Sequence, residues 1–172
     1  MNGPLFVTRR LVPSLRPIAP ADALAVHQLL RDLAVASWLR SAGQSGPFSL
    51  AECEAIVARK VAHWTAHGFG TSLAWHDGHV LGWSLLGHCL VDGRSEVEIG
   101  WTVAHDDWGW GTGTELGVHA LNAARSAGLQ RVVAFTRRDN AASRRIMEKL
   151  AMLHESDIEH AGLPHVVYSI AP

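Results

Sequence analysis

A glycine-rich turn between a strand pattern and a helix pattern constrains this chain more than any other feature. The turn carries glycine at every second position in Gly109-Trp110-Gly111-Thr112-Gly113. Residues 96–104, before it, alternate polar with apolar as a strand does, and the residues from Thr114 onward place apolar or small side chains on one helical face. Glycine permits positive φ and leaves backbone N–H groups uncovered, so this layout predicts an anion site at a helix N-terminus.

The turn does not match the two commonest phosphate-binding motifs. A P-loop requires Gly-Lys followed by Ser or Thr, and the turn carries no lysine. The dinucleotide fingerprint requires a third glycine three residues after the second, and Leu116 stands there. A tight strand-to-helix connection without a ligand therefore stays open as the alternative reading of the turn alone.

A second helix pattern, Asp139 to Leu150, follows the strand-like residues 131–135 and makes the turn more specific. Trp108-Gly109-x-Gly-x-Gly-Thr-Glu and Asn140-x-x-Ser-x-x-x-x-Glu-Lys-Leu together resemble the GNAT-fold N-acetyltransferases, specifically their RimJ/RimL-like branch. The resemblance covers nearly the whole chain, including Thr8-Arg9-Arg10-Leu11 near its start. It implies transfer of the acetyl group of acetyl-coenzyme A (acetyl-CoA) to a primary amine in a ternary complex.

The order of expected elements agrees with that family. Asp-Gly pairs at 77–78 and 92–93 predict two hairpins, which would join strands within 71–104 into an antiparallel meander. Alternating strands and helices follow, so the fold class is α/β, with α and β elements around a mixed sheet. The resemblance implies the GNAT fold: a central, largely antiparallel sheet with a splayed parallel pair and flanking helices, in a single domain of residues 1–172.

Toward the N-terminus we expect a first strand within residues 5–15 and a helix from Pro20 that ends before the polar loop 41–47. Ser49, with Glu52 three residues later, predicts a capping box at the start of a second helix.

Composition limits the classes of partner. With 172 residues and 48% hydrophobic content the chain is not disordered, and its net charge of −1 disfavours a nucleic-acid binder. No apolar run approaches the ~20 residues of a membrane span. Cys53 and Cys89 form no Cys-x-x-Cys motif and no leader pattern is present, so we expect a cytoplasmic protein. A homodimer stays open.

The resemblance also assigns the cofactor site. The N–H groups of the turn would hold the pyrophosphate, backbone groups of the preceding strand would meet the pantetheine where that strand splays near Val103, and Asn140 would bond the same arm. Asn140 equally suits a helix N-cap, so that reading stays open. The residues assigned to the cofactor are Trp101, Val103, Trp108, Gly109, Trp110, Gly111, Thr112, Gly113, Thr114, Asn140 and Ser143.

Two residues are candidates for proton transfer. Glu98 would act as general base, often through water in this family, with Glu96 in reserve; a solvated charge pair is the alternative. Many members carry a tyrosine acid seven residues after the motif asparagine, but here Met147 stands there and cannot donate a proton. Ser143 would then serve the departing thiolate, unless it is only a small helix residue. A GNAT-fold cofactor-binding or regulatory module without turnover is the alternative function.

The sequence says less about a metal site and about the acceptor amine than about the cofactor. His63 and His67 stand four apart and could share a helix face, but no third ligand is near in sequence and no Glu follows His63, so we expect no metal. The acceptor amine could belong to a protein N-terminus, an amino acid, a polyamine or an aminoglycoside. A strongly acidic cleft would favour the polycations.

Overall fold

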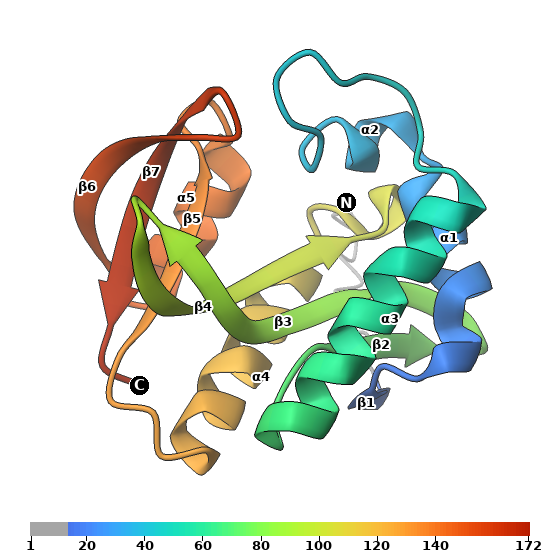
Figure 1. Cartoon of the computed structure of the whole chain (residues 1–172), viewed down its shortest axis with the longest axis horizontal. Coiled ribbons are helices and arrows are strands. Elements are labelled where there is room, and N and C mark those ends of the chain that lie inside the picture. Colours follow the sequence, from blue (N-terminus) through green and yellow to red (C-terminus); the bar gives the residue numbers. More distant parts are fainter. Residues whose placement is uncertain (1–13) are drawn as a thin grey trace, which may run out of the picture.

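The computed structural model describes residues 14–172, whose strands form one seven-stranded sheet in the order β1-β2-β3-β4-β5-β7-β6 (Figure 1). Residues 5–13 of the expected first strand, and the Thr8–Leu11 motif, lie outside the described residues. Among the described residues, no helix is long and apolar enough to cross a membrane. The strands are β1 (Ser14–Pro17), β2 (Ser72–His76), β3 (His79–Val91), β4 (Arg94–Val103), β5 (Val132–Arg137), β6 (Leu153–His160) and β7 (Leu163–Ile170).

Strands β2 to β4 form the expected antiparallel meander, and β1 pairs with β2 at its edge, also antiparallel. Asp77 and Gly78 have φ of 48° and 79°, and Asp92 and Gly93 have φ of 50° and 74°. Positive φ at both central residues is the backbone of a two-residue hairpin whose twist matches that of its strands. Both predicted hairpins are confirmed.

The first helical region is broken where the sequence suggested one helix. The 3-10 turn η1 (Pro20–Asp22) leads into α1 (Ala23–Leu30), and α2 (Leu33–Ala36) begins separately. The carboxylate of Asp32 accepts a hydrogen bond from the N–H of Ala34 at 2.7 Å, so it caps a new helix. The expectation of a continuous helix was therefore wrong.

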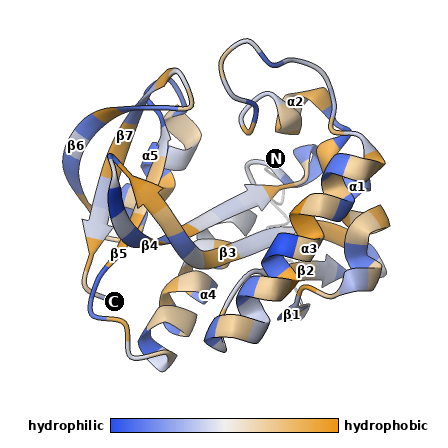
Figure 2. Cartoon of the chain, in the orientation of Figure 1, coloured by the Kyte–Doolittle hydropathy of each residue, from blue (hydrophilic) through white to orange (hydrophobic). Residues whose placement is uncertain are grey.

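Helix α3 (Leu50–His67) begins at the predicted capping box. Ser49 Oγ accepts from the N–H of Glu52, and the Glu52 carboxylate accepts from the N–H of Ser49. Hydrophobic and hydrophilic residues alternate along α3 (Figure 2), as in a helix with one face on the core. The helix ends at Gly68, whose φ of 71° provides the left-handed C-cap.

The remaining elements are the 3-10 turn η2 (His105–Asp107) and helices α4 (Thr112–Ser126) and α5 (Ala141–Lys149). Neighbouring residues of β2 show that helices cover both faces of the sheet. Leu73 packs in the cluster formed with α1 and α3, whereas Ala74 packs with Leu116 of α4. Successive side chains of a strand point to opposite faces.

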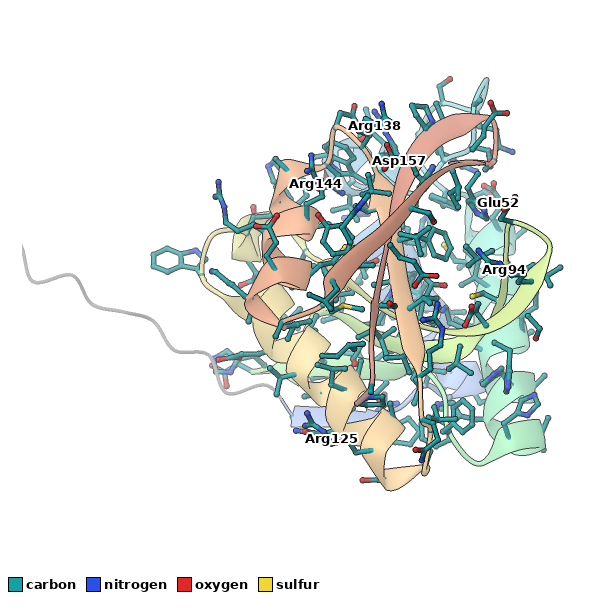
Figure 3. All side chains as sticks on the ribbon, turned by 90° about the vertical axis from the view of Figure 1, so that its left-hand side faces the viewer. Glu52, Arg94, Arg125, Arg138, Arg144 and Asp157 are labelled. Carbon is teal, nitrogen blue, oxygen red and sulfur yellow. The ribbon has the colours of Figure 1, made fainter. Side chains whose placement is uncertain are left out.

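At the other edge of the sheet, Arg138 forms a surface ion pair with Asp157 of β6 (Figure 3).

The sheet opens between β4 and β5. These two strands are parallel and share a single register pair, Glu98 with Val133. β4 stays paired with β3 as far as Val103, while β5 stays paired with β7 as far as Arg137. Each strand therefore follows its other neighbour, and the two diverge beyond Glu98 (Figure 1). The splayed parallel pair is confirmed, although it opens earlier along β4 than residue 103.

Gly82 keeps β3 in contact with β4, and this gives a stability prediction. A Cβ at Gly82 would lie 2.0 Å from the carbonyl oxygen of Thr102, which is backbone and cannot turn aside. We expect Gly82→Ala to cost about 1–3 kcal/mol or more and to lower the thermal midpoint by about 2–4 °C per kcal/mol. Gly87→Ala on the same strand is the control, since its Cβ would meet nothing closer than 3.7 Å. Equal midpoints for both variants would contradict the prediction.

Candidate active site

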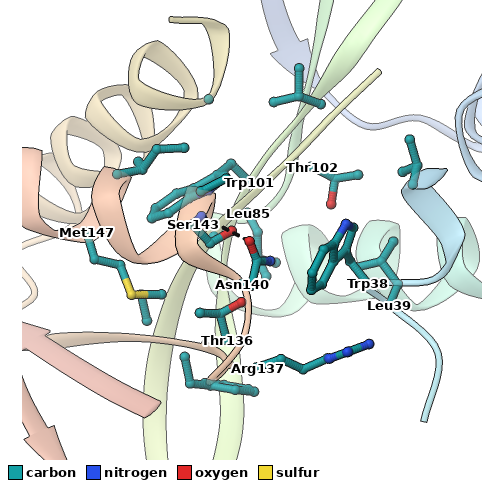
Figure 4. A pocket seen from close by; sticks show the side chains of 18 of the residues that line it. Trp38, Leu39, Leu85, Trp101, Thr102, Thr136, Arg137, Asn140, Ser143 and Met147 are labelled. Atoms are coloured by element: carbon teal, nitrogen blue, oxygen red, sulfur yellow. Dashed lines mark hydrogen bonds between the residues drawn. The ribbon is translucent and has the colours of Figure 1, made fainter. Parts of the chain in front are cut away.

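A cavity of about 910 Å³ occupies the opening between β4 and β5. Residues 98–103 of β4 and 134–137 of β5 form its two walls. The glycine turn and the start of α4 close one side together with the first turn of α5, and residues 38–41 after α2 approach from the other side (Figure 4). The splay therefore creates the space that the expected cofactor site requires.

The glycine turn has the predicted backbone. Gly109 and Gly111 have φ of 82° and 91°, and Gly111 is the N-cap of α4. The first N–H groups of a helix have no intrahelical carbonyl partner and carry a positive partial charge. Gly113 packs closely against α5, because a Cβ there would lie 2.7 Å from Cδ1 of Ile146, the mobile end of that side chain. The turn thus joins a helix N-terminus to a close contact between α4 and α5.

Two tryptophans of the turn behave differently. The indole Nε1 of Trp108 donates to the carbonyl oxygen of Val103 at 2.9 Å, which ties the turn to the end of β4. That carbonyl keeps one further lone pair, so the backbone of Val103 can still meet a ligand beside the turn. Trp110 is 54% exposed and does not line the cavity, so the structure does not bring it together with the other cofactor candidates.

The start of α5 presents Asn140 and Ser143 to the cavity (Figure 4). Asn140 Oδ1 accepts from the N–H of Ser143 at 3.1 Å, so Asn140 is the N-cap of α5. Capping uses the carbonyl oxygen and leaves the amide nitrogen of the same side chain as the atom that can face a ligand. The two readings of Asn140 are therefore compatible. Met147 is buried beside them.

Glu98 and Lys60 are two ionisable residues of the cavity wall that interact electrostatically. Burial raises the pKa of Glu98 to about 7, while the charge of Lys60 opposes that rise. Burial lowers the pKa of Lys60 to about 8, opposed in turn by Glu98. Lys60 Nζ donates to Thr71 Oγ1 at 3.1 Å and lies 4.9 Å from the ring centre of Trp83. Both groups can change protonation near neutral pH, as acid–base catalysis requires.

The sequence did not single out Lys60, although a signal was present. Val57, Val61 and Trp64 form the inner stripe of α3, and a lysine among them faces the core side of the helix. Glu96, the reserve base, is elsewhere: it pairs with Arg131 at 3.3 Å and does not line the cavity. The structure therefore separates the two acidic candidates that sequence alone left together.

The far end of the cavity is aromatic and carries an arginine (Figure 4). The Arg137 guanidinium lies 4.8 Å from the ring centre of Trp38 and pairs with Asp139 at 2.6 Å. The backbone N–H of Ala42 donates to the carbonyl oxygen of Ala161 at 2.9 Å, joining the segment after α2 to the β6–β7 turn. This contact bounds the opening opposite the glycine turn.

In a comparison with known protein families, residues 14–153 match the model of the family described as "Acetyltransferase (GNAT) domain". The matched range contains the strands and helices that form both walls of the cavity and the glycine turn.

Solved structures share the fold. A structure of yncA from Salmonella typhimurium with its cofactor acetyl-CoA has a TM-score of 0.72 at 20% identity, covering 92% of this chain and 93% of that one. The structure of an N-acetyltransferase from Staphylococcus aureus Mu50 has a TM-score of 0.75 at 18% identity, covering 92% of this chain and 98% of that one. The structure of an acetyltransferase from Agrobacterium tumefaciens has a TM-score of 0.73 at 20% identity, covering 95% of this chain and 93% of that one. At these identities the likeness concerns the fold.

Proposed function

The chain belongs to the GNAT acetyltransferase family, and we propose that it is a RimJ/RimL-like N-acetyltransferase that uses acetyl-CoA to acetylate a primary amine. The observation that carries the proposal is the placement of Glu98, with a pKa of about 7, on the cavity wall that leads to the glycine turn. We further propose that residues 1–172 act as a single domain in the cytoplasm.

The phosphate end of the cofactor would lie at the N-terminus of α4. N–H groups of the turn at Gly109, Gly111 and Thr112 supply donors, and the helix dipole favours an anion there. Arg145 and Lys149 of α5 also line the cavity and add positive charge without making the whole chain basic. The pantetheine arm would follow β4 past the N–H of Val103 and the amide nitrogen of Asn140.

Glu98 and Ser143 would manage the protons. Acetyl-CoA supplies an activated acyl group: the amine nitrogen bonds to the thioester carbon, the C–S bond breaks, and the sulfur leaves with its electron pair. Glu98 accepts the proton that the amine loses, directly or through one water. Ser143 can donate a proton toward the sulfur. The chain's one tyrosine, Tyr168, is buried in the core and does not line the cavity.

The charges of the cavity favour some acceptors over others. Its described lining carries five cationic residues, Arg40, Lys60, Arg137, Arg145 and Lys149, against the three acids Glu98, Asp107 and Asp139, and Asp139 is paired with Arg137. Cations outnumber acids in this lining, so it is not the strongly acidic surface that would attract a polyamine or aminoglycoside. We therefore propose that the acceptor is a protein N-terminal α-amine or a small molecule with a single amine, whose apolar part packs against Trp38 and Leu39.

An amine panel tests the proposal directly. Release of free thiol from acetyl-CoA is measured with N-terminal peptides, amino acids, a polyamine and an aminoglycoside, and calorimetry measures binding of the cofactor itself. We expect binding, and amine-dependent thiol release with a peptide or a small monoamine. Binding without transfer to any amine would favour the cofactor-binding module, and no binding at millimolar acetyl-CoA would overturn both functions.

The role of Ser143 gives a prediction that depends on the donor. Ser143→Ala should lower kcat with acetyl-CoA because the departing thiolate loses a proton source, but by less than loss of the base, since water can substitute. With a donor whose leaving thiol is more acidic, the penalty should shrink. The measurement is the ratio of kcat values for the two donors in both proteins. Equal penalties would remove Ser143 from the acid role.

A further inference from the structure

Three histidines meet at the C-terminal end of α3, outside the residues that line the cavity. His63 and His67 come from α3, and His88 comes from β3. The ring centres lie 4.5 Å apart for His63 and His67, 5.3 Å for His63 and His88, and 4.4 Å for His67 and His88. The spacing of four residues already suggested that His63 and His67 share a helix face, and the fold adds the imidazole of His88, which is distant in sequence.

Hydrogen bonding orients His63 as a ligand would be oriented. Its Nδ1 lies 3.0 Å from the carbonyl oxygen of Phe69, and because a carbonyl can only accept, Nδ1 carries the hydrogen. Its Nε2 therefore carries the lone pair, which accepts from the backbone N–H of His88 at 3.1 Å and lies 3.1 Å from Nδ1 of the same residue. Metal-binding histidines characteristically donate their second ring N–H to a carbonyl or carboxylate in this way. Phe69 thus occupies the position of an outer-shell partner.

A metal ion binds the neutral form of imidazole through a ring lone pair, and three rings this close can direct their lone pairs at one ion. A proton added to the cluster meets like charges at short range, whereas a metal ion replaces the protons and uses the lone pairs.

The distances suit a first-row transition metal after small side-chain movements. One donor atom from each residue lies within 4.8 Å of the other two, and His63 Nε2 is 3.1 Å from His88 Nδ1. Tetrahedral zinc with Zn–N bonds of about 2.0–2.1 Å requires nitrogen atoms about 3.3 Å apart. The exposed rings of His67 and His88 can turn inward to reach this spacing. A metal at His63 Nε2 would displace the backbone N–H of His88, now 3.1 Å away, which would bond to water instead on this exposed part of β3.

We propose that His63, His67 and His88 bind one zinc ion, or a first-row ion of similar preference, and thereby clip the end of α3 to β3. Three protein ligands leave the fourth position of a tetrahedral site to water. The site lies beside the strand that carries Glu98, since Gly87, next to His88, is the register partner of Glu98. The proposal rests on these contacts and not on the acetyl-transfer activity.

Calorimetric titration of the full chain with ZnCl2 tests the site, after removal of any histidine tag and of adventitious metal. We expect one ion per chain, a rise in thermal midpoint with ZnCl2, and with CoCl2 the intense visible absorption of tetrahedral cobalt. His67→Ala and His88→Ala remove exposed side chains, so both variants should fold. Each should lose more than the ~10- to 100-fold in affinity that an outer-shell change costs.

His154→Ala is the matched control, because His154 is also exposed but pairs with Asp157 on β6, away from the cluster. Its zinc affinity should equal that of the unchanged protein. The proposal is overturned if the unchanged protein binds no zinc. It is equally overturned if His67→Ala and His88→Ala bind as tightly as the unchanged protein, or if His154→Ala loses affinity as much as they do.

Discussion

Replacing Glu98 by glutamine should lower kcat by roughly 10²- to 10⁴-fold, the usual contribution of a positioned general base, with little change in cofactor affinity. In the unchanged protein, kcat/KM should fall as pH drops through about 7, because burial raises the pKa of Glu98 to about 7 and only the ionised carboxylate accepts a proton. The variant should lack this acidic limb. The measurement is a pH–rate profile of both proteins.

Two further variants sharpen this test. Glu96→Gln removes a carboxylate of the same strand that pairs with Arg131 outside the cavity, so it should keep the acidic limb. Lys60→Met removes the charge that lowers the pKa of Glu98, so it should move the limb to higher pH. An acidic limb that survives in Glu98→Gln, or that disappears in Glu96→Gln, would assign the base elsewhere.

Thermal stability separates catalysis from structure at Glu98. A carboxyl group whose folded pKa is raised stabilises the fold at pH values below its unfolded pKa, and that contribution is lost as pH rises through about 7. Above pH 7 the ionised group opposes folding, so Glu98→Gln should keep or raise the thermal midpoint at pH 8. A large drop there would indicate a structural role instead.

Replacing Gly111 by valine should weaken cofactor binding. The Kd should rise by roughly 100-fold or more, which corresponds to a loss of about 2.7 kcal/mol of binding free energy. Gly111 has φ of 91° at the N-cap of α4, and a β-branched residue is strongly disfavoured there. A Cβ at this position would meet no atom within 4 Å, so the change acts through the backbone and not through a clash. Calorimetry with acetyl-CoA gives the affinity.

Gly78→Val is the matched control. Gly78 has φ of 79° in the β2–β3 hairpin, its Cβ would also meet nothing within 4 Å, and it lies outside the cavity lining. Both variants carry similar backbone strain, so both should lose similar stability, but only Gly111→Val should lose the cofactor. Unchanged acetyl-CoA affinity in Gly111→Val would remove the turn from the binding site.

Local features of the fold could be predicted from the sequence because their causes are local. Positive φ at Gly111 follows from what glycine permits, the capping box at Ser49 from a spacing of three residues, and the hairpins from Asp-Gly pairs. The helix predicted after Pro20 failed at Asp32, where a short side chain caps a new helix and overrides the apolar periodicity. A cap of one residue is a weak signal within a longer hydrophobic pattern.

Apart from the break at Asp32, the sequence by itself determined the order of strands and helices, the glycine turn and the presence of Glu98 and Ser143. Side-chain period, turn chemistry and motif spacing act within a few residues. The tertiary structure decided which groups meet. It placed Lys60 beside Glu98, drew Glu96 away to Arg131, left Trp110 outside the cavity and brought His88 to His63. Packing of α3 on the sheet and the divergence of β4 from β5 set these distances, and both depend on contacts between residues far apart in the chain.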